Sequence, residues 1–129
     1  MKLIFLCTLT LFFVFKVNGS AIIPIIPQQT LIECEPQATD KSLFTRHVQD
    51  TGSFLTVKKR TVIYPEDGSN KTIIHCIKAI DNIAATDVNY GTIKIVEGGI
   101  GQSNVVFKIE SQRGYGYNYD IEIYGQIKK

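Results

Sequence analysis

The sequence predicts an all-β fold, a single-domain antiparallel β-sandwich-like structure of about six to eight short strands with one disulfide. Beyond residue 19 the chain holds 18 Ile and 7 Val but only 3 Leu, 5 Ala and no Met. β-Branched side chains pack well on sheets, whereas Leu, Ala and Met favour helices. Short segments of alternating polarity recur every 8–14 residues between Gly-, Asn- and Asp-rich turns. That spacing is typical of sandwiches and barrels.

The first 19 residues have the pattern of a secretory signal peptide. Lys2 precedes an apolar run from Leu3 to Phe15, which is shorter than the roughly 20 residues that a membrane span needs. Gly19 is a small residue at the expected cleavage point. We therefore expect cleavage between Gly19 and Ser20, a secreted extracellular product, and no membrane attachment afterwards.

Removal of that segment makes the chain neutral. Lys2 and Lys16 carry the whole formal charge of +2, and 12 basic and 12 acidic residues remain. A neutral chain argues against direct nucleic-acid binding, which needs surplus Lys and Arg for phosphate contacts. It argues equally against binding to an anionic membrane surface. The remaining chain is long enough for one hydrophobic core.

The start of the remaining chain is predicted to be extended. Residues 20–30 contain Pro24 and Pro27, which exclude a helix. They are predicted to form an N-terminal arm, or a first edge strand that begins near Thr30. Residues 31–129 are predicted to form the β domain. At its start, the segment from Cys34 to Thr51 fits a strand or a short helical turn.

The later strands are predicted from alternation with a period of two residues. Residues 54–58 and 60–64 are predicted as strands, and the Asp67-Gly68 pair after them is a hairpin signal. Residues 72–81 are almost continuously apolar, which predicts a central strand buried on both faces. The remaining predicted strands cover residues 91–97, 104–111 and 117–124.

Glycine-rich segments are predicted to separate the last strands. Residues 98–101 form a hairpin turn, residues 112–116 form a second turn, and Gly125 ends the last strand. The basic run Lys58–Arg60 allows three interpretations, namely a charged bend between strands, a dibasic processing site or part of a nuclear-localisation signal.

Two covalent features are predicted for a secreted product. Cys34 and Cys76 are the only cysteines after residue 19, and two cysteines in a secreted chain most simply form one disulfide. Two buried free thiols are the alternative. Asn70 begins the sequon Asn70-Lys71-Thr72 in a polar turn, so it is a candidate N-glycosylation site.

The C-terminal half resembles the insect family named after multiprotein bridging factor 2. The resemblance lies in Asp81-Asn82, in Gly91 at the start of an alternating strand, and in three later motifs. These motifs are Glu97-Gly98-Gly99-Ile100-Gly101, Ser111-Gln112-Arg113-Gly114 followed by Gly116, and Ile121-Glu122-Ile123-Tyr124-Gly125. The resemblance implies a small secreted protein of saliva, venom or haemolymph. The alternative that it implies is a transcriptional coactivator that bridges a nuclear receptor and the basal machinery, as described for the founding member.

No motif in the sequence points to catalysis, a metal or a cofactor. His47 and His75 lie in different segments, and His75 and its neighbour Cys76 would point to opposite faces of a strand. Neither a Gly-x-Ser-x-Gly elbow nor a zinc-ligand pattern is present. Asp120 and Glu122 share one strand face, as two acids of a glycosidase might, but such spacing is common in sheets. We expect a non-enzymatic protein without cofactors.

A binding role is predicted instead, toward a protein partner or a small apolar ligand. Four of the six tyrosines fall within residues 115–124. If Tyr115, Tyr117 and Tyr119 point inward they belong to the core, and if they point outward they form an aromatic contact strip. Candidate residues of the binding surface are Tyr90, Gly99, Arg113, Tyr115 and Tyr124.

Overall fold

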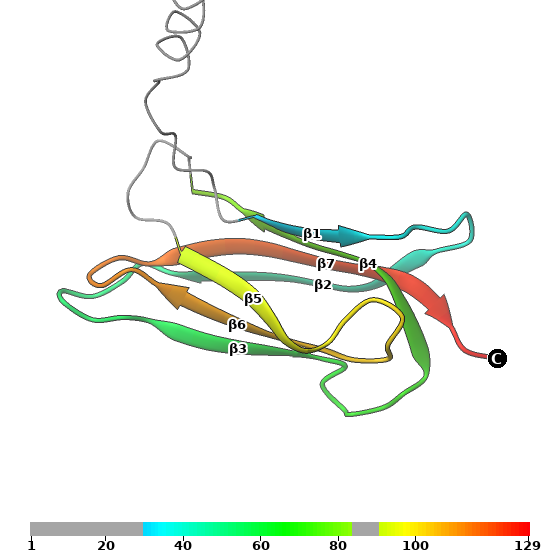
Figure 1. The fold of residues 1–129 in the computed structure, drawn as a ribbon. Coiled ribbons are helices and arrows are strands. Elements are labelled where there is room, and N and C mark those ends of the chain that lie inside the picture. The colour runs from blue at the N-terminus through cyan, green and yellow to red at the C-terminus, as the bar shows by residue number, and fades with distance from the viewer. Residues whose placement is uncertain (1–29, 84–90) are drawn as a thin grey trace, which may run out of the picture.

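Figure 1 shows the fold in a computed structural model, which describes residues 30–83 and 91–129. The expected signal peptide, the arm up to residue 29 and Tyr90 therefore lie outside the described residues. Across the described ranges there is no helix long and apolar enough to cross a bilayer.

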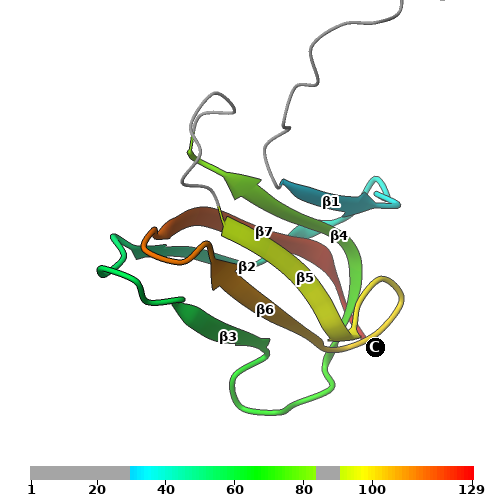
Figure 2. The ribbon, with the colours of Figure 1, turned by 60° about the vertical axis from the view of Figure 1, so that its left-hand side comes forward.

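The described residues form seven antiparallel strands in two sheets. A four-stranded sheet has the order β1-β4-β7-β2, and a three-stranded sheet has the order β3-β6-β5. Figure 2 shows the two layers packed face to face, which confirms the sandwich-like all-β prediction. In chain order the strands are β1 (Leu31–Cys34), β2 (Lys41–Asp50), β3 (Lys59–Tyr64), β4 (Thr72–Asp81), β5 (Gly91–Gly98), β6 (Val105–Ser111) and β7 (Tyr117–Ile127).

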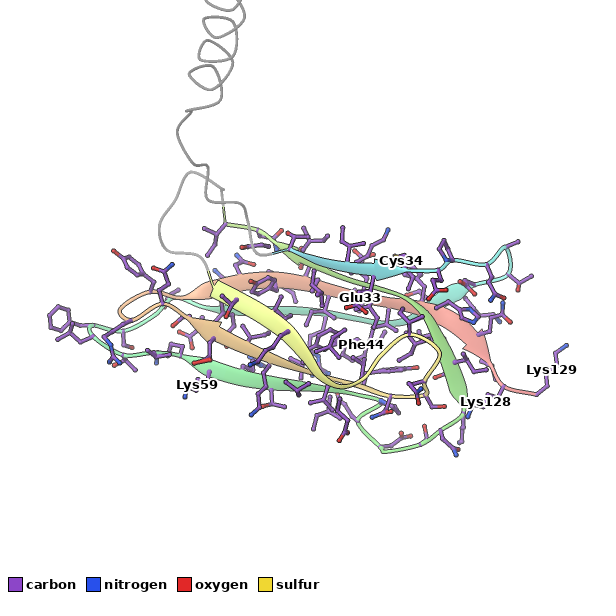
Figure 3. All side chains as sticks on the ribbon, in the orientation of Figure 1. Glu33, Cys34, Phe44, Lys59, Lys128 and Lys129 are labelled. Atoms are coloured by element: carbon purple, nitrogen blue, oxygen red, sulfur yellow. A yellow bond between two sulfur atoms is a disulfide. The ribbon has the colours of Figure 1, made fainter. Side chains whose placement is uncertain are left out.

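The hydrophobic core lies between the sheets. Tyr119 and Phe107, the two largest fully buried side chains, come from β7 and β6, which are both inner strands of their sheets. Phe44 of β2 also lies between the layers (Figure 3), with its ring 5.3 Å from that of Tyr64 on β3. Isoleucines of β7 and β4 complete this interior. Ile and Val therefore make up most of the buried core.

The strands with clear alternation are confirmed. Along β7, Tyr117, Tyr119, Ile121 and Ile123 are buried and the residues between them are half-buried. β6 buries its residues Val105, Phe107 and Ile109 in the same way. The ambiguous segment after Cys34 forms the strand β2, and β1 is the edge strand expected to begin near Thr30.

Residues 72–81 form the predicted central strand, because β4 lies between β1 and β7, but the outer face of this strand is only partly buried. In β4 the pairing register with β7 shifts between Ile74 and Cys76, which reverses the alternation. Ile74, Ile77 and Ala79 consequently all lie in the core. Ile80 on the outer face is only half-buried, whereas Cys76 is buried beside the β1 strand.

Residues 54–58 do not form the predicted strand. Phe54 and Leu55 lie in a turn, and Thr56 N–H donates to the Ser53 carbonyl over 3.1 Å. The strand β3 begins at Lys59, so the basic run continues into a strand rather than forming a bend. Residues 54–57 have the composition of a strand, but none of the described strands pairs with them.

Two further boundary predictions are wrong. Asp67-Gly68 does form a turn, but β3 and β4 belong to different sheets, so the segment is a crossover and not a hairpin. Gly125 does not end the last strand, because β7 continues to Ile127. A Cβ atom at Gly125 would lie 2.0 Å from the Ile73 carbonyl oxygen. Glycine is therefore needed there for close approach of β4 rather than for termination.

Candidate functional site

Two connections lie side by side at one end of the sandwich (Figure 1). Residues 51–58 join β2 to β3, and residues 112–116 join β6 to β7. Gly114 N–H donates to the Thr56 carbonyl over 2.9 Å, and Arg113 Nη1 donates to the Leu55 carbonyl over 3.0 Å. These bonds fix the conformation of one loop against the other.

Glycines allow the two loop backbones to approach closely. A Cβ atom at Gly116 would lie 1.7 Å from the Asp50 carbonyl oxygen. A Cβ atom at Gly52 would lie 2.6 Å from the Tyr115 carbonyl carbon, and Gly52 also has φ = 89°. The Asp50 carboxylate accepts a hydrogen bond from Gly52 N–H over 2.8 Å. The loops are thus interlocked through their backbones.

Leu55 has a backbone conformation that is unusual for its residue type. Its φ is +56°, and it is the only described non-glycine residue with a positive φ. A side chain in this left-handed region costs about 1–2 kcal/mol. Such strain persists only where the surrounding structure enforces it, and here the bonds from Arg113 and Gly114 do so.

The interlocked loops present apolar side chains to solvent. Phe54 is 88% exposed, Leu55 61% and Tyr115 41%. We call these three residues the apolar loop tip. They account for nearly half of the large apolar side chains that are exposed among the described residues. Exposed aromatic and apolar groups on rigidly held loops are typical of binding surfaces.

The predicted binding-surface residues have different environments. Tyr115 is exposed, unlike Tyr117 and Tyr119, which are core residues. Arg113 is exposed but its guanidinium supports the Leu55 carbonyl, so it positions the loop tip. Gly99 is buried, which contradicts its assignment to an exposed surface. Its turn is held against β4 by two hydrogen bonds with Ile74.

Tyr124 lies at a distance from the loop tip, on the outer face of the four-stranded sheet. It is half-buried, its hydroxyl donates to the Glu122 carboxylate, and Lys78 Nζ lies 5.7 Å from its ring centroid. Asn70 is exposed in the crossover between β3 and β4. The predicted residues are therefore spread over several faces and do not form one surface.

Cys34 and Cys76 form the predicted disulfide. They face each other directly in the β1–β4 ladder. Beside them, His75 Nδ1 and Asp40 Oδ1 are 2.7 Å apart in a largely buried pair. Gln37 N–H and Gln126 Nε2 also donate to the Asp40 carboxylate. This group ties the β1–β2 loop to the strand β4.

A second histidine–carboxylate pair, unforeseen from the sequence, lies on the outer face of the four-stranded sheet. His47 Nδ1 is 2.6 Å from Asp120 Oδ1 across the β2–β7 ladder. Asn82 Nδ2 donates to the other Asp120 oxygen over 3.0 Å, and His47 Nε2 lies 3.4 Å from Gln49 Oε1. Within the described part of the chain, no group of three or more His, Cys, Asp or Glu residues is placed to hold a metal ion.

We predict that this pair makes stability depend on pH. The hydrogen bond with Asp120 raises the pKa of His47 above 6.5, and the bond with His47 lowers the pKa of Asp120 below 3.8. The His47 contribution is complete below pH 6.5 and is lost as pH rises through the raised pKa. The Asp120 contribution is complete above pH 3.8 and is lost as pH falls through the lowered pKa. The pair therefore stabilises the fold most between these two values.

The test is an NMR titration of the His47 ring, in which Asp120→Asn should shift the midpoint down toward 6.5. Lys71→Gln, an exposed change elsewhere, should leave the midpoint unchanged. A midpoint that is the same with and without the Asp120 carboxylate would contradict the assignment.

The fold and loops define a class, a small disulfide-linked β-sandwich with an exposed apolar loop tip. The family described as "Transcription activator MBF2" matches residues 35–125. The chain belongs to this family, which confirms the resemblance noted in the sequence.

Comparison with single proteins gives a more limited match. A bumblebee protein (Bombus ignitus) named "Probable salivary secreted peptide" is 42% identical over 53 residues. The match covers 41% of this chain and 38% of that protein. No solved structure matches significantly.

Proposed function

We propose that this chain is a secreted, non-enzymatic protein that binds another protein through the apolar loop tip. The observation that carries the proposal is the exposure of Phe54, Leu55 and Tyr115 on loops that are interlocked and strained. A preformed surface loses little conformational entropy on binding. A protein partner is favoured over a small ligand because small-ligand sites are concave, whereas the Phe54 side chain protrudes into solvent.

Secretion is supported by three observations of different kinds. The first 19 residues match a signal peptide, the Cys34–Cys76 disulfide is typical of oxidising compartments, and a similar bumblebee protein carries a secreted-peptide name. Asn70 is exposed, as an N-linked glycan would require.

The test compares a loop-tip variant with a matched control. The full chain, Phe54→Ser/Tyr115→Ser and the control Ile32→Ser/Ile127→Ser are collected from insect-cell medium and immobilised. Ile32 and Ile127 are 57% and 60% exposed and lie on β1 and β7. Proteins retained from insect saliva and haemolymph are identified, and the retained partner is purified.

We expect the loop-tip variant to raise the Kd for the purified partner about tenfold or more, as for a binding hot spot. The control should change it less than twofold. Equal binding by both variants, or no protein enriched by the unmodified chain, would contradict the proposal.

The family description favours a second candidate function, activation of transcription. The resemblance to the founding member implies that this activation would work by bridging a nuclear receptor and the basal machinery. The two candidates differ in compartment and thiol state. A product in the medium that begins at Ser20 and lacks two cysteine hydrogens supports secretion. Full-length, reduced protein confined to the cells supports the transcriptional role.

A further inference from the structure

The outer face of the three-stranded sheet carries a group of cations around an open pocket of about 310 Å³. All three strands of that sheet contribute to the pocket, which lies on a different surface from the apolar loop tip. Its lining contains more basic side chains than acidic ones. The charged and polar residues of the lining are Lys59, Arg60, Thr61, Lys94, Lys108 and Glu110, and of these Arg60 alternates with Lys59 and Thr61 along β3, opposite the buried Ile109.

Two of these cations are placed where sheet stability disfavours them. Lys94 of β5 and Lys108 of β6 are direct cross-strand partners, and both are exposed. Like charges directly opposite each other in a sheet are destabilising. On the other sheet the corresponding partners are complementary, since Lys78 faces Glu122. The Lys94–Lys108 pair is thus the one like-charged pair directly opposite each other in the described strand registers.

A third ammonium group lies within reach of the same pocket. Lys59 of β3 faces Glu110 of β6, two residues along the strand from Lys108. Diagonal neighbours of this kind are about 7–8 Å apart, and direct partners about 5 Å apart. A single tetrahedral anion between the three flexible side chains can therefore accept hydrogen bonds from all of them.

The acidic side chain of the pocket only partly offsets this charge. Lys59 Nζ lies 3.9 Å from Glu110 Oε1, and the two side chains are 72% and 50% exposed. An exposed pair at that distance is weak. Lys94 and Lys108 have no carboxylate of the pocket left to neutralise them, so the pocket retains a net positive charge.

We propose that this pocket binds a sulfate group of an extracellular carbohydrate. A compact anion suits a few cations in one pocket, whereas membrane recognition uses clusters of about 4–8 Lys or Arg. Long nucleic acids require an extended basic surface, and the chain beyond residue 19 is neutral. The preference for sulfated carbohydrate over other anions rests on the proposed secretion. The affinity for the sulfated sugar is measured on purified protein, so its test does not depend on whether the chain is secreted.

The experiment uses the full disulfide-bonded chain and a heparin-derived tetrasaccharide, titrated by calorimetry at low and physiological salt. Lys94→Gln/Lys108→Gln is compared with Lys71→Gln/Lys128→Gln, which removes the same charge at exposed positions outside the pocket. Glu110→Gln removes the competing carboxylate. The desulfated tetrasaccharide and vesicles of phosphatidylcholine with phosphatidylserine are the comparison ligands.

We expect Lys94→Gln/Lys108→Gln to raise the Kd at least tenfold, the control to change it less than twofold, and Glu110→Gln to lower it. Binding should weaken as salt increases. Because the lysines repel each other, the Lys94→Gln/Lys108→Gln variant should unfold at a temperature no lower than the unmodified chain, which separates lost binding from lost folding.

Three results would overturn the proposal. Equal weakening by the control variant would mean that net charge alone is responsible. Unchanged affinity for the desulfated sugar would remove sulfate from recognition. Binding to the vesicles without binding to the tetrasaccharide would assign the pocket to phospholipid headgroups.

Discussion

Replacing Cys34 and Cys76 together by serine will lower the free energy of unfolding by about 4 kcal/mol, according to the loop-entropy relation. The two cysteines are 42 positions apart, so their bond greatly restricts the unfolded chain. Single domains of this size are stable by only about 5–15 kcal/mol. The expected loss of about 4 kcal/mol is therefore a large share of the free energy of unfolding. The strand β1 should be affected most, because its four residues pair only with β4.

Urea unfolding of the unmodified chain and of the double serine variant measures this effect. Reductant should destabilise the unmodified chain by a similar amount and leave the variant unchanged, which separates the bond from other effects of the substitutions. A loss below about 1 kcal/mol would show that the bond is not a main constraint. Labelling of both cysteines by iodoacetamide in unfolded, unreduced protein would show that the bond is absent.

The fold class was predictable because its signals are local. β7 and β6 each alternate between core and outer side chains along their whole lengths, and one sheet face buried against another requires this period. The excess of Ile and Val in the sequence also reflects sheet faces that are buried against each other. Residues 98–101 were also predictable as a turn, because their glycines lie between two strands that pair directly.

The wrong predictions share a different cause, which is contact between residues distant in the sequence. The turn at Leu55 is held by Arg113, 58 positions away. Gly125 is required by the carbonyl of Ile73, and the bulge near His75 follows from pairing with β7. None of these partners can be inferred from a local pattern, so the sequence indicated strands and endings that the three-dimensional contacts exclude.

The candidate sites also divide into residues that a local pattern indicates and residues that only distant contacts reveal. Tyr115 and Arg113 could be singled out by residue type, but Phe54 was assigned to a strand. The like-charged pair Lys94–Lys108 and the His47–Asp120 pair depend on strand register, which a single sequence does not specify. These two pairs of side chains could be recognised only once the structure showed which strand residues lie opposite each other.

The largest effect of a single substitution is expected at Phe107. Its side chain is fully buried on β6, the central strand of the three-stranded sheet, where Val62 and Ile95 are its cross-strand partners. Phe107→Ala should lower the free energy of unfolding by about 3–5 kcal/mol, because the lost transfer free energy adds to the cost of the cavity. Thermal and urea unfolding followed by circular dichroism measure it.

Val106→Ala is the matched control, because Val106 is the neighbouring residue and is half-buried on the opposite face of β6. It removes apolar side-chain atoms from the same strand without opening a cavity between the sheets, so it should cost less than about 1 kcal/mol. Equal losses in the two variants would mean that β6 contributes mainly through strand pairing. A much larger loss of unfolding free energy at Phe107 would instead show that the packing of the two sheets depends on this interior side chain. The positions of the loops and of the basic pocket depend on that packing.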